Sequence, residues 1–284
     1  MAEATAPASA ANLGAGFDTL ALALELRCRV EAQIADDWQT NHLGPEVPPP
    51  EDADRVLEAA RLATRNTRAL SIVVRNEIPV GRGLGASAAA AVAGYAAAKR
   101  ALDQAVSADQ AQQAASELDG HADNAAASAF GGLVAVTVRG RARRLRIHSD
   151  LEVVVAVPEE PLPTDWARAV LSGHVDRGVA VRSIARVVAV VEGLRTADPG
   201  LLADAMGDEL HEQPRSALRP EIEDVLAAAR DAGAVFACWS GAGPSVLALA
   251  AGREQRDQVA KALSDHLGSA GQVIKPRVAT EGLI

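Results

Sequence analysis

Three glycines at alternate positions precede a run of small residues in the stretch PVGRGLGASAAAA, residues 79–91. Gly81, Gly83 and Gly85 permit positive φ angles and leave main-chain N–H groups open to a ligand. A helix that begins near Ser87 adds unpaired N–H donors and the positive end of its dipole. This arrangement binds phosphate, Arg82 adds a positive charge, and the Ser87 hydroxyl either caps the helix or ligates a phosphate-held metal.

The loop matches neither of the two common nucleotide motifs, since no Gly-Lys-Ser/Thr follows and the spacing is not Gly-x-Gly-x-x-Gly. On its residues alone it is either a phosphate site or a structural turn. Two more loops of small residues, APASAANLGAGFD (6–18) and SGAGPS (240–245), lie near opposite ends of the chain. Three such loops indicate convergence on one ligand.

Hydrophobic patterning predicts the α/β elements that position these loops. A domain boundary is expected near Asp150, without a flexible linker, and residues 44–52 form a proline-rich loop. Strands are predicted at 19–35 (one long strand or a pair), 69–79, 133–138, 151–158, 234–240, 245–251 and 272–280. Helices are predicted after 52 to about 65, at 87–100, from a Ser107 cap, within 120–132, from 158 to about 230, and between 251 and 272.

The composition of the chain limits the classes of fold and function that it can have. The chain has 284 residues, of which 49% are hydrophobic and only 2% aromatic, so we expect a compact α/β core of small residues. A net charge of −9 argues against a nucleic-acid partner, and the basic cluster at 139–146 is interpreted as a turn and an edge strand. No signal peptide or membrane segment is apparent, and two cysteines fit a reducing cytoplasm.

Taken together, the motifs resemble those of the GHMP kinases and, among them, the homoserine kinases. The glycine stretch is similar to that family's second motif, and WSGAGPSVLAL to its third. The other similar stretches are APASAANLGAGFDTLALAL, GHADNAAASAFGGLV, TDWARAVL and LHEQPRSALRP. The resemblance implies a two-layer α/β fold, with a ribosomal-S5-domain-2-like nucleotide domain at 1–150 and a ferredoxin-like substrate domain at 151–284. ATP and Mg²⁺ would be its cofactors.

The resemblance also implies a site between the two domains. Asp18 would bind a substrate ammonium group, Arg168 and Arg215 its carboxylate, and Asn124 would orient its hydroxyl. Taken singly, Asp18 also fits a turn cap, and the arginines fit solvated helix positions. The expected substrate residues are Asn12, Asp18, His121, Asn124, Thr164, Arg168, Arg215 and Gly241; the expected nucleotide residues are Pro79, Gly81, Arg82, Gly83, Leu84, Gly85, Ala86, Ser87 and Ala88.

Two departures from the family pattern bear on catalysis. Gln113 stands where a metal-binding glutamate is usual, so Glu117, one helical turn later, is expected to hold Mg²⁺ with Ser87; the alternative is a solvated surface glutamate. Asn124 stands where mevalonate-type relatives have an aspartate base. This favours direct phosphoryl transfer without a strong base, with Asp123 as the rival base.

The expected activity is ATP-dependent phosphorylation of the side-chain hydroxyl of L-homoserine, towards threonine. The alternatives are a GHMP kinase for another small alcohol, such as threonine or a mevalonate-like acid, and a non-catalytic nucleotide or amino-acid sensor. Ala86, which stands where the first motif serine is usual, and Gln113 would favour the sensor. The resemblance allows a homodimer, which nothing in the sequence establishes.

Overall fold

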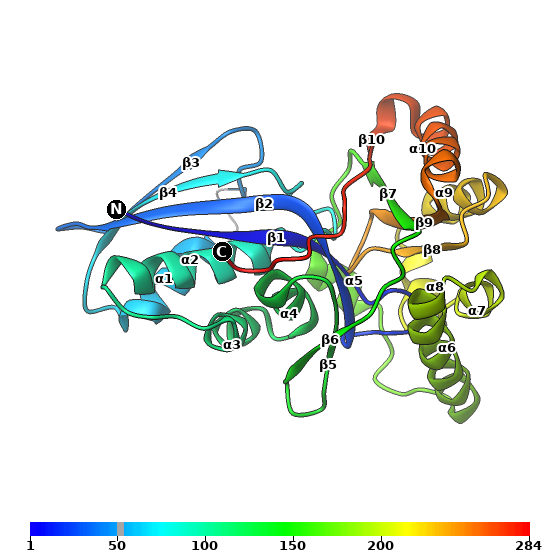
Figure 1. Ribbon diagram of the computed structural model, residues 1–284, viewed down its shortest axis with the longest axis horizontal. Coiled ribbons are helices and arrows are strands. Elements are labelled where there is room, and N and C mark those ends of the chain that lie inside the picture. The colour runs from blue at the N-terminus through cyan, green and yellow to red at the C-terminus, as the bar shows by residue number, and fades with distance from the viewer. Residues whose placement is uncertain (50–53) are drawn as a thin grey trace.

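The computed structural model describes residues 1–49 and 54–284, which form two β-sheets with helices packed against them. In Figure 1 the N-terminal sheet and helices α1–α4 occupy the left half, and the C-terminal sheet with the later helices occupies the right half. The proline-rich loop predicted at 44–52 falls partly on residues 50–53, which lie outside the described residues.

The N-terminal sheet has six strands in the order β3-β4-β2-β5-β6, with β1 paired to β2 off this path. β2 is one continuous strand of 15 residues, which decides between the two predictions for this segment. The basic cluster forms the turn and edge strand that were expected, because β6 is the last strand of the order. The strands are β1 (Ala2–Ala11), β2 (Leu20–Ile34), β3 (Gln39–Leu43), β4 (Leu70–Asn76), β5 (Leu133–Val136) and β6 (Ala142–Leu145).

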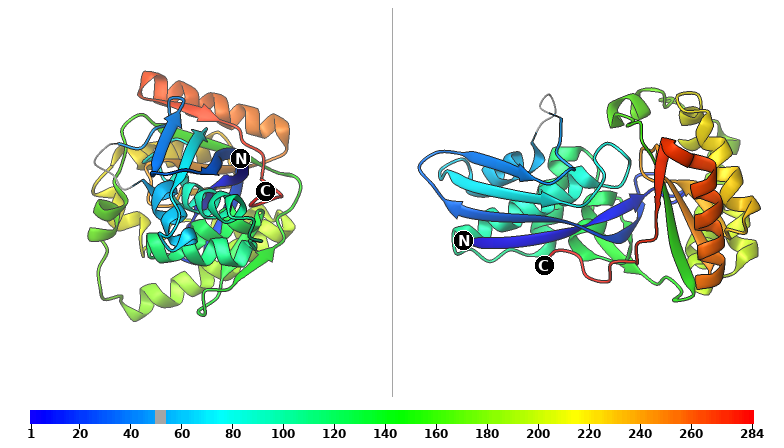
Figure 2. Two further views of the ribbon diagram at one scale, coloured as in Figure 1. Left: turned by 90° about the vertical axis from the view of Figure 1, so that its left-hand side faces the viewer. Right: turned by 90° about the horizontal axis from the view of Figure 1, so that it is seen from above.

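Helices α1, α2 and α4 lie against this sheet and α3 packs against those helices; Figure 2 shows this half from two further directions. Ser107 caps α3 through a reciprocal capping box with Gln110, and Gly131 ends α4, both as the sequence predicts. The helices are α1 (Arg55–Thr64), α2 (Ala86–Ala101), α3 (Ala108–Asp119) and α4 (Asp123–Phe130).

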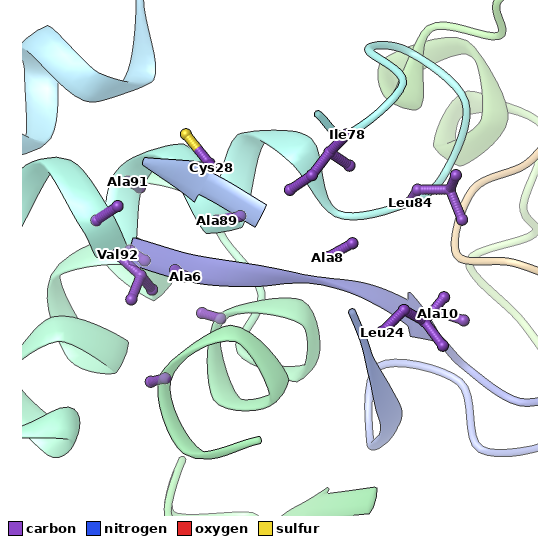
Figure 3. Close-up of a cluster of buried hydrophobic side chains, with 14 of the residues drawn as sticks. Ala6, Ala8, Ala10, Leu24, Cys28, Ile78, Leu84, Ala89, Ala91 and Val92 are labelled. Carbon is purple, nitrogen blue, oxygen red and sulfur yellow. The ribbon is translucent and has the colours of Figure 1, made fainter. Parts of the chain in front are cut away.

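Alanine sets the distance between sheet and helix in this half. Ala6, Ala8 and Ala10 of β1 are fully buried in the same cluster as Ala89 of α2, and Figure 3 shows their short side chains between the elements. At Gly94 of α2 an added Cβ would lie only 2.8 Å from a main-chain oxygen of α1. Small residues therefore let α2, which follows the glycine loop, sit close to its neighbours.

The C-terminal sheet has the antiparallel order β10-β7-β9-β8. Counted within this half, that order is 4-1-3-2 with helices after the first and third strands, which is the expected ferredoxin-like arrangement. Its strands are β7 (Leu151–Pro158), β8 (Phe236–Trp239), β9 (Val246–Ala251) and β10 (Gly271–Ile274). The helices are α5 (Thr164–Ala169), α6 (Arg177–Thr196), α7 (Pro199–Asp204), α8 (Glu212–Ser216), α9 (Glu221–Asp231), α10 (Arg253–Leu267) and the short 3₁₀ helix Gly268–Ala270.

Two expectations need correction. Residues 6–11, expected in a small-residue loop, belong to β1, because pairing with β2 outweighs the low strand propensity of alanine. The last strand ends at Ile274, and the following residues return to the N-terminal sheet, where the Arg277 carbonyl accepts a 2.9 Å hydrogen bond from the Glu25 N–H. The domain boundary near Asp150 stays a prediction. The residues after Ile274 cross back from the C-terminal half to the N-terminal half.

Among the described residues, no helix combines the length and the apolar character that a bilayer crossing requires.

Candidate active site

A cleft of about 500 Å³ lies where the two halves of the molecule meet. Its walls come from the glycine loop after β4, the start of α4, the segment around α5, and the loop between β8 and β9. Every site residue expected from the sequence lines this cleft except Arg82 and Glu117. The three small-residue loops therefore converge, as their composition predicts.

The glycine loop packs too tightly against its neighbours to accept side chains. Gly81, Gly83 and Gly85 have φ angles of 69°, 72° and 68°, the region that glycine alone occupies freely. A Cβ on Gly83 would lie 2.2 Å from the Ser240 carbonyl oxygen, and one on Gly85 would lie 2.1 Å from the Ser9 Oγ. The Ser240 hydroxyl also donates to the Gly83 carbonyl at 2.8 Å, so the glycine loop and the loop between β8 and β9 are joined directly.

Helix α2 begins at this loop without a side-chain cap. Its N-cap residue is Gly85, no acidic residue lies in its first turn, and the Ser87 hydroxyl donates to Asp119 at 2.8 Å. Within residues 1–49 and 54–284, no side chain accepts from the first-turn N–H groups, and the positive end of the dipole meets the cleft. An anion is the complementary ligand for such a helix start.

Arg82 points away from the cleft. Its guanidinium donates to the carbonyl oxygens of Val80 at 2.9 Å, Pro158 at 2.9 Å and Glu159. These bonds fasten the glycine loop to the end of β7. The structure therefore gives the Arg82 side chain a positioning role and does not support the added phosphate charge expected from the sequence.

A carboxylate that sequence reasoning missed lies beside Ser87. Asp119 ends α3 in the cleft, accepts from Ser87 and forms a 3.2 Å ion pair with Arg55, which also lines the cleft. Glu117 lies outside the cleft, where its carboxylate accepts a 3.1 Å hydrogen bond from Gln113. The position of Glu117 thus does not support the metal role expected for it.

Asp18 and Arg168 form a bidentate ion pair at the other end of the cleft. The two N–O distances are 2.7 and 3.2 Å, and about a third of each side chain is exposed. The hydrogen bonds that Arg168 donates to the Asp18 carboxylate raise the pKa of Arg168. The two groups expected to bind opposite charges of one substrate are therefore paired with each other.

Arg215 is almost completely buried and is held by three hydrogen bonds. It donates from Nε to the Ala167 carbonyl at 3.1 Å and from Nη1 to the Gly241 carbonyl at 2.9 Å. His211 Nε2 donates to the Gly14 carbonyl, so its Nδ1 accepts from Arg215 Nη1 at 2.8 Å. Burial, and then the positive charge of Arg168, lowers the pKa of Arg215 to about 10.

Phe17 joins this cluster, although the sequence analysis gave it no role. The guanidinium carbons of Arg168 and Arg215 each lie 5.7 Å from its ring centroid, and its ring stacks on His211 at 5.2 Å. Cation–π contact with one ring places the two guanidinium groups beside a common space. Among the described residues, the hydrogen bonds of Arg215 use only Nε and Nη1, so Nη2 is available to a ligand.

Asn124 and its neighbours line the cleft between the start of α2 and the Asp18–Arg168 pair. The Asn124 Oδ1 accepts from Ser9 at 2.8 Å. The buried Asp123 carboxylate accepts from the Asn124 N–H at 2.8 Å and from His121 Nδ1 at 2.9 Å. Burial opposes protonation of His121, but the hydrogen bond and charge of Asp123 outweigh it and raise the His121 pKa.

Three remaining predicted residues complete the substrate end of the cleft. The side-chain amide of Asn12 donates to the Gly241 carbonyl at 2.8 Å, and its Oδ1 accepts from the Asp18 N–H at 3.0 Å. Thr164 begins α5 at the cleft wall. Two guanidinium groups and a carboxylate at one end, with an uncapped helix start at the other, can bind a small zwitterion next to a phosphate chain.

Two sequence models of one protein family match this chain. The model for the GHMP kinases N terminal domain matches residues 54–132, and the GHMP kinases C terminal model matches residues 190–269. The chain belongs to the GHMP kinase family.

Within that family the chain is similar to homoserine kinases. It is 37% identical over 259 residues to the homoserine kinase of Moorella thermoacetica, covering 88% of each chain. It is 40% identical over 276 residues to that of Rhodococcus erythropolis, covering 87% of this chain and 85% of that protein. The crystal structure of homoserine kinase from Cytophaga hutchinsonii superposes with a TM-score of 0.88 at 28% identity, over 100% of this chain and 96% of that one.

Proposed function

We propose that this chain is an ATP-dependent kinase that phosphorylates the side-chain hydroxyl of L-homoserine to give O-phospho-L-homoserine. Homoserine kinases at 37% and 40% identity over most of the chain support the substrate. The single structural observation that carries the proposal is the Asp18–Arg168 pair beside the buried Arg215, in one cleft with the start of α2. The proposal also places the chain in the cytoplasm, where its two buried free cysteines would stay reduced.

The ion pair suits a substrate that carries both charges. An amino-acid ammonium group replaces Arg168 at Asp18, while the amino-acid carboxylate replaces Asp18 at Arg168 and takes the free Nη2 of Arg215. Each protein charge exchanges one partner for another of the same sign, so neither is left unpaired in the cleft. A substrate without an ammonium group leaves Asp18 uncompensated.

The phosphate end fits a nucleotide with Mg²⁺. The N–H groups at the start of α2 bind phosphate, and the hydroxyl of Ser87 with the carboxylate of Asp119 supplies the oxygen donors that Mg²⁺ takes from a protein. Magnesium usually completes its shell with phosphate oxygens and water, so two protein ligands suffice. When bound, the ion neutralises the charge of the phosphate chain.

Asn124 is placed to orient the substrate hydroxyl between these two ends. Its Oδ1 is fixed by Ser9, and its main-chain N–H is fixed by Asp123. The Asp123 carboxylate already accepts hydrogen bonds from His121 and from the Asn124 N–H, so its contacts suit it to positioning these two residues. This arrangement favours transfer that depends on orientation and charge neutralisation, because phosphoryl transfer has a loose transition state.

An ADP-release assay with homoserine, threonine, mevalonate and shikimate tests the proposal. We expect turnover of homoserine, with kcat/KM for the other three lower by at least about 100-fold, because a lost charge partner or a displaced hydroxyl each costs that much. Faster phosphorylation of another alcohol would reassign the substrate. If ATP binds and none of the four is phosphorylated, the chain is a sensor with this fold.

The metal assignment predicts different outcomes for two neighbouring carboxylates of α3. Asp119→Asn is expected to raise the Mg²⁺ concentration needed for half-maximal activity by at least about 10-fold, because a metal oxygen ligand loses its charge. Glu117→Gln is the matched control, with a change below about twofold, since Glu117 lies outside the cleft. Binding of an ATP analogue, titrated with and without Mg²⁺, gives a second readout. The reverse pattern would restore the role predicted for Glu117.

A further inference from the structure

Arg55 is the first residue of α1, and its side chain reaches the start of α2. The two helices lie side by side (Figure 1), and an added Cβ at Gly94 of α2 would lie 2.8 Å from the Val56 oxygen. From this contact the Arg55 side chain extends to Ser87, about two helical turns before Gly94. There its Nε donates to the Ser87 hydroxyl at 3.3 Å. The close packing of α1 on α2 therefore brings a guanidinium group to the helix start that faces the cleft.

Two carboxylates hold Arg55 in this position. Its Nη1 donates to Glu58, one turn later in α1, at 2.7 Å, and its Nε lies 3.2 Å from the Asp119 Oδ1. The Arg55 side chain is 32% exposed, whereas that of Asp119 is 7% exposed. Because Asp119 also accepts from Ser87, a guanidinium, a hydroxyl and a carboxylate meet at the first turn of α2.

Guanidinium groups line both ends of the cleft. Among the described residues that line it, these groups belong to Arg55, Arg168 and Arg215, and no lysine contributes. Arg168 and Arg215 lie beside Phe17 at the substrate end, while Arg82 is bound to the end of β7. A guanidinium group matches phosphate oxygens in shape and charge. Arg55 is thus placed to offset the charge of a phosphate chain at the start of α2.

We propose that Arg55 binds the phosphate chain of the nucleotide beyond its α-phosphate, an inference that rests on the proposed kinase function. A metal ion bound with a nucleotide is held by the β- and γ-phosphates, and Ser87 and Asp119 are the residues assigned to that ion. Arg55 contacts both of them, so it faces the same phosphates. When Asp119 turns to the metal, Arg55 exchanges this carboxylate for a phosphate oxygen. Each protein charge then keeps a partner of opposite sign.

Calorimetric titration of the full chain with a non-hydrolysable ATP analogue, and separately with AMP, tests this role. Arg55→Met is expected to raise the dissociation constant of the ATP analogue by at least about 10-fold, because a hydrogen-bonded charge partner of the phosphates is lost. The value for AMP should change by less than about twofold, since AMP lacks the β- and γ-phosphates. Arg55→Lys keeps the charge and should stay within about threefold of the wild-type chain.

Arg61→Met is the matched control for these titrations. Arg61 lies in the last turn of the same helix and outside the described lining of the cleft, so this variant should bind the ATP analogue like the wild-type chain. Thermal unfolding of each variant checks that α1 and its neighbours stay folded. An equal loss for AMP and for the ATP analogue in Arg55→Met would mean that Arg55 supports the fold of the site, and it would overturn the proposal.

A second background separates phosphate binding from simple neutralisation of Asp119. In the Asp119→Asn variant, titrated without Mg²⁺, adding Arg55→Met should still raise the dissociation constant of the ATP analogue by at least about fivefold. No further increase would show that Arg55 acts only as the partner of Asp119, which overturns the proposal. These titrations need no turnover of homoserine. A chain that binds ATP through Arg55 without phosphorylating homoserine would refute the proposed substrate alone, and a wild-type chain that binds no ATP analogue would refute both.

Discussion

Gly83→Ala is expected to lower kcat/KM for ATP by at least about 100-fold. The new Cβ would lie 2.2 Å from the Ser240 carbonyl oxygen and 2.7 Å from the Gly243 nitrogen. These neighbours are main-chain atoms, so the glycine loop itself must move, and displacement of a binding loop by about 1 Å costs about 100-fold in rate. Steady-state kinetics with varied ATP, together with titration of an ATP analogue, measures the effect.

Gly140→Ala separates this clash from simple backbone strain. Gly140 has a φ angle of 71°, almost the same as the 72° of Gly83, but a Cβ there meets no atom of the described residues within 4 Å. Both variants lose about 1–2 kcal/mol of stability from the left-handed conformation. Only Gly83→Ala should lose ATP binding. Equal kinetics for the two variants would mean that the glycine loop does not hold the nucleotide.

Arg215→Ala is expected to reduce kcat/KM for homoserine by roughly 100- to 1,000-fold while the KM for ATP changes by less than about threefold. Removing one member of a buried charge pair costs about 2–5 kcal/mol, and every 1.4 kcal/mol is a factor of ten. Arg215 is 1% exposed, and its pKa of about 10 keeps it charged at neutral pH. Kinetics with each substrate varied in turn separates the two effects.

Two further measurements distinguish loss of substrate contact in Arg215→Ala from loss of folding. Arg168→Ala should lose less, about 10-fold, because a guanidinium that is a third exposed contributes less than a buried one. Added guanidinium ion should restore part of the Arg215→Ala activity by filling the vacated space, which a merely unfolded variant would not show. A folded Arg215→Ala variant with unchanged kcat/KM for homoserine would exclude contact between Arg215 and the substrate.

Much of the fold could be predicted because its signals are local. Ser107 and Gln110 form a capping box within four residues, and Gly131 ends α4 directly after its last helical residue. The strand at Ala2–Ala11 was missed because alanine has little strand preference of its own. That strand forms through pairing with β2 and burial against α2, which involve residues far away in the chain.

The sequence was sufficient to predict which loops meet at the site. It was not always sufficient to predict which side chain of a loop or helix faces the cleft. Glu117 and Asp119 are two residues apart in α3, and two residues turn a helix by about 200°. Spacing alone predicts Glu117, whereas the carboxylate that lines the cleft is that of Asp119. Asp54 and Arg55 also line the cleft. Their place at the start of α1, where Asp54 is the N-cap and Arg55 the first helical residue, is a sequence signal that could have indicated them.

The sequence by itself determined the glycine turn, the helix that follows it and the types of charge available to a ligand, since these depend on neighbouring residues and on composition. Only the tertiary structure decided that Arg82 binds β7 and leaves the cleft, that Asp119 lies beside Ser87, and that Phe17 contacts both Arg168 and Arg215. The direction of a long side chain depends on which distant carbonyls, carboxylates and rings the packing brings within reach, and no local pattern specifies those.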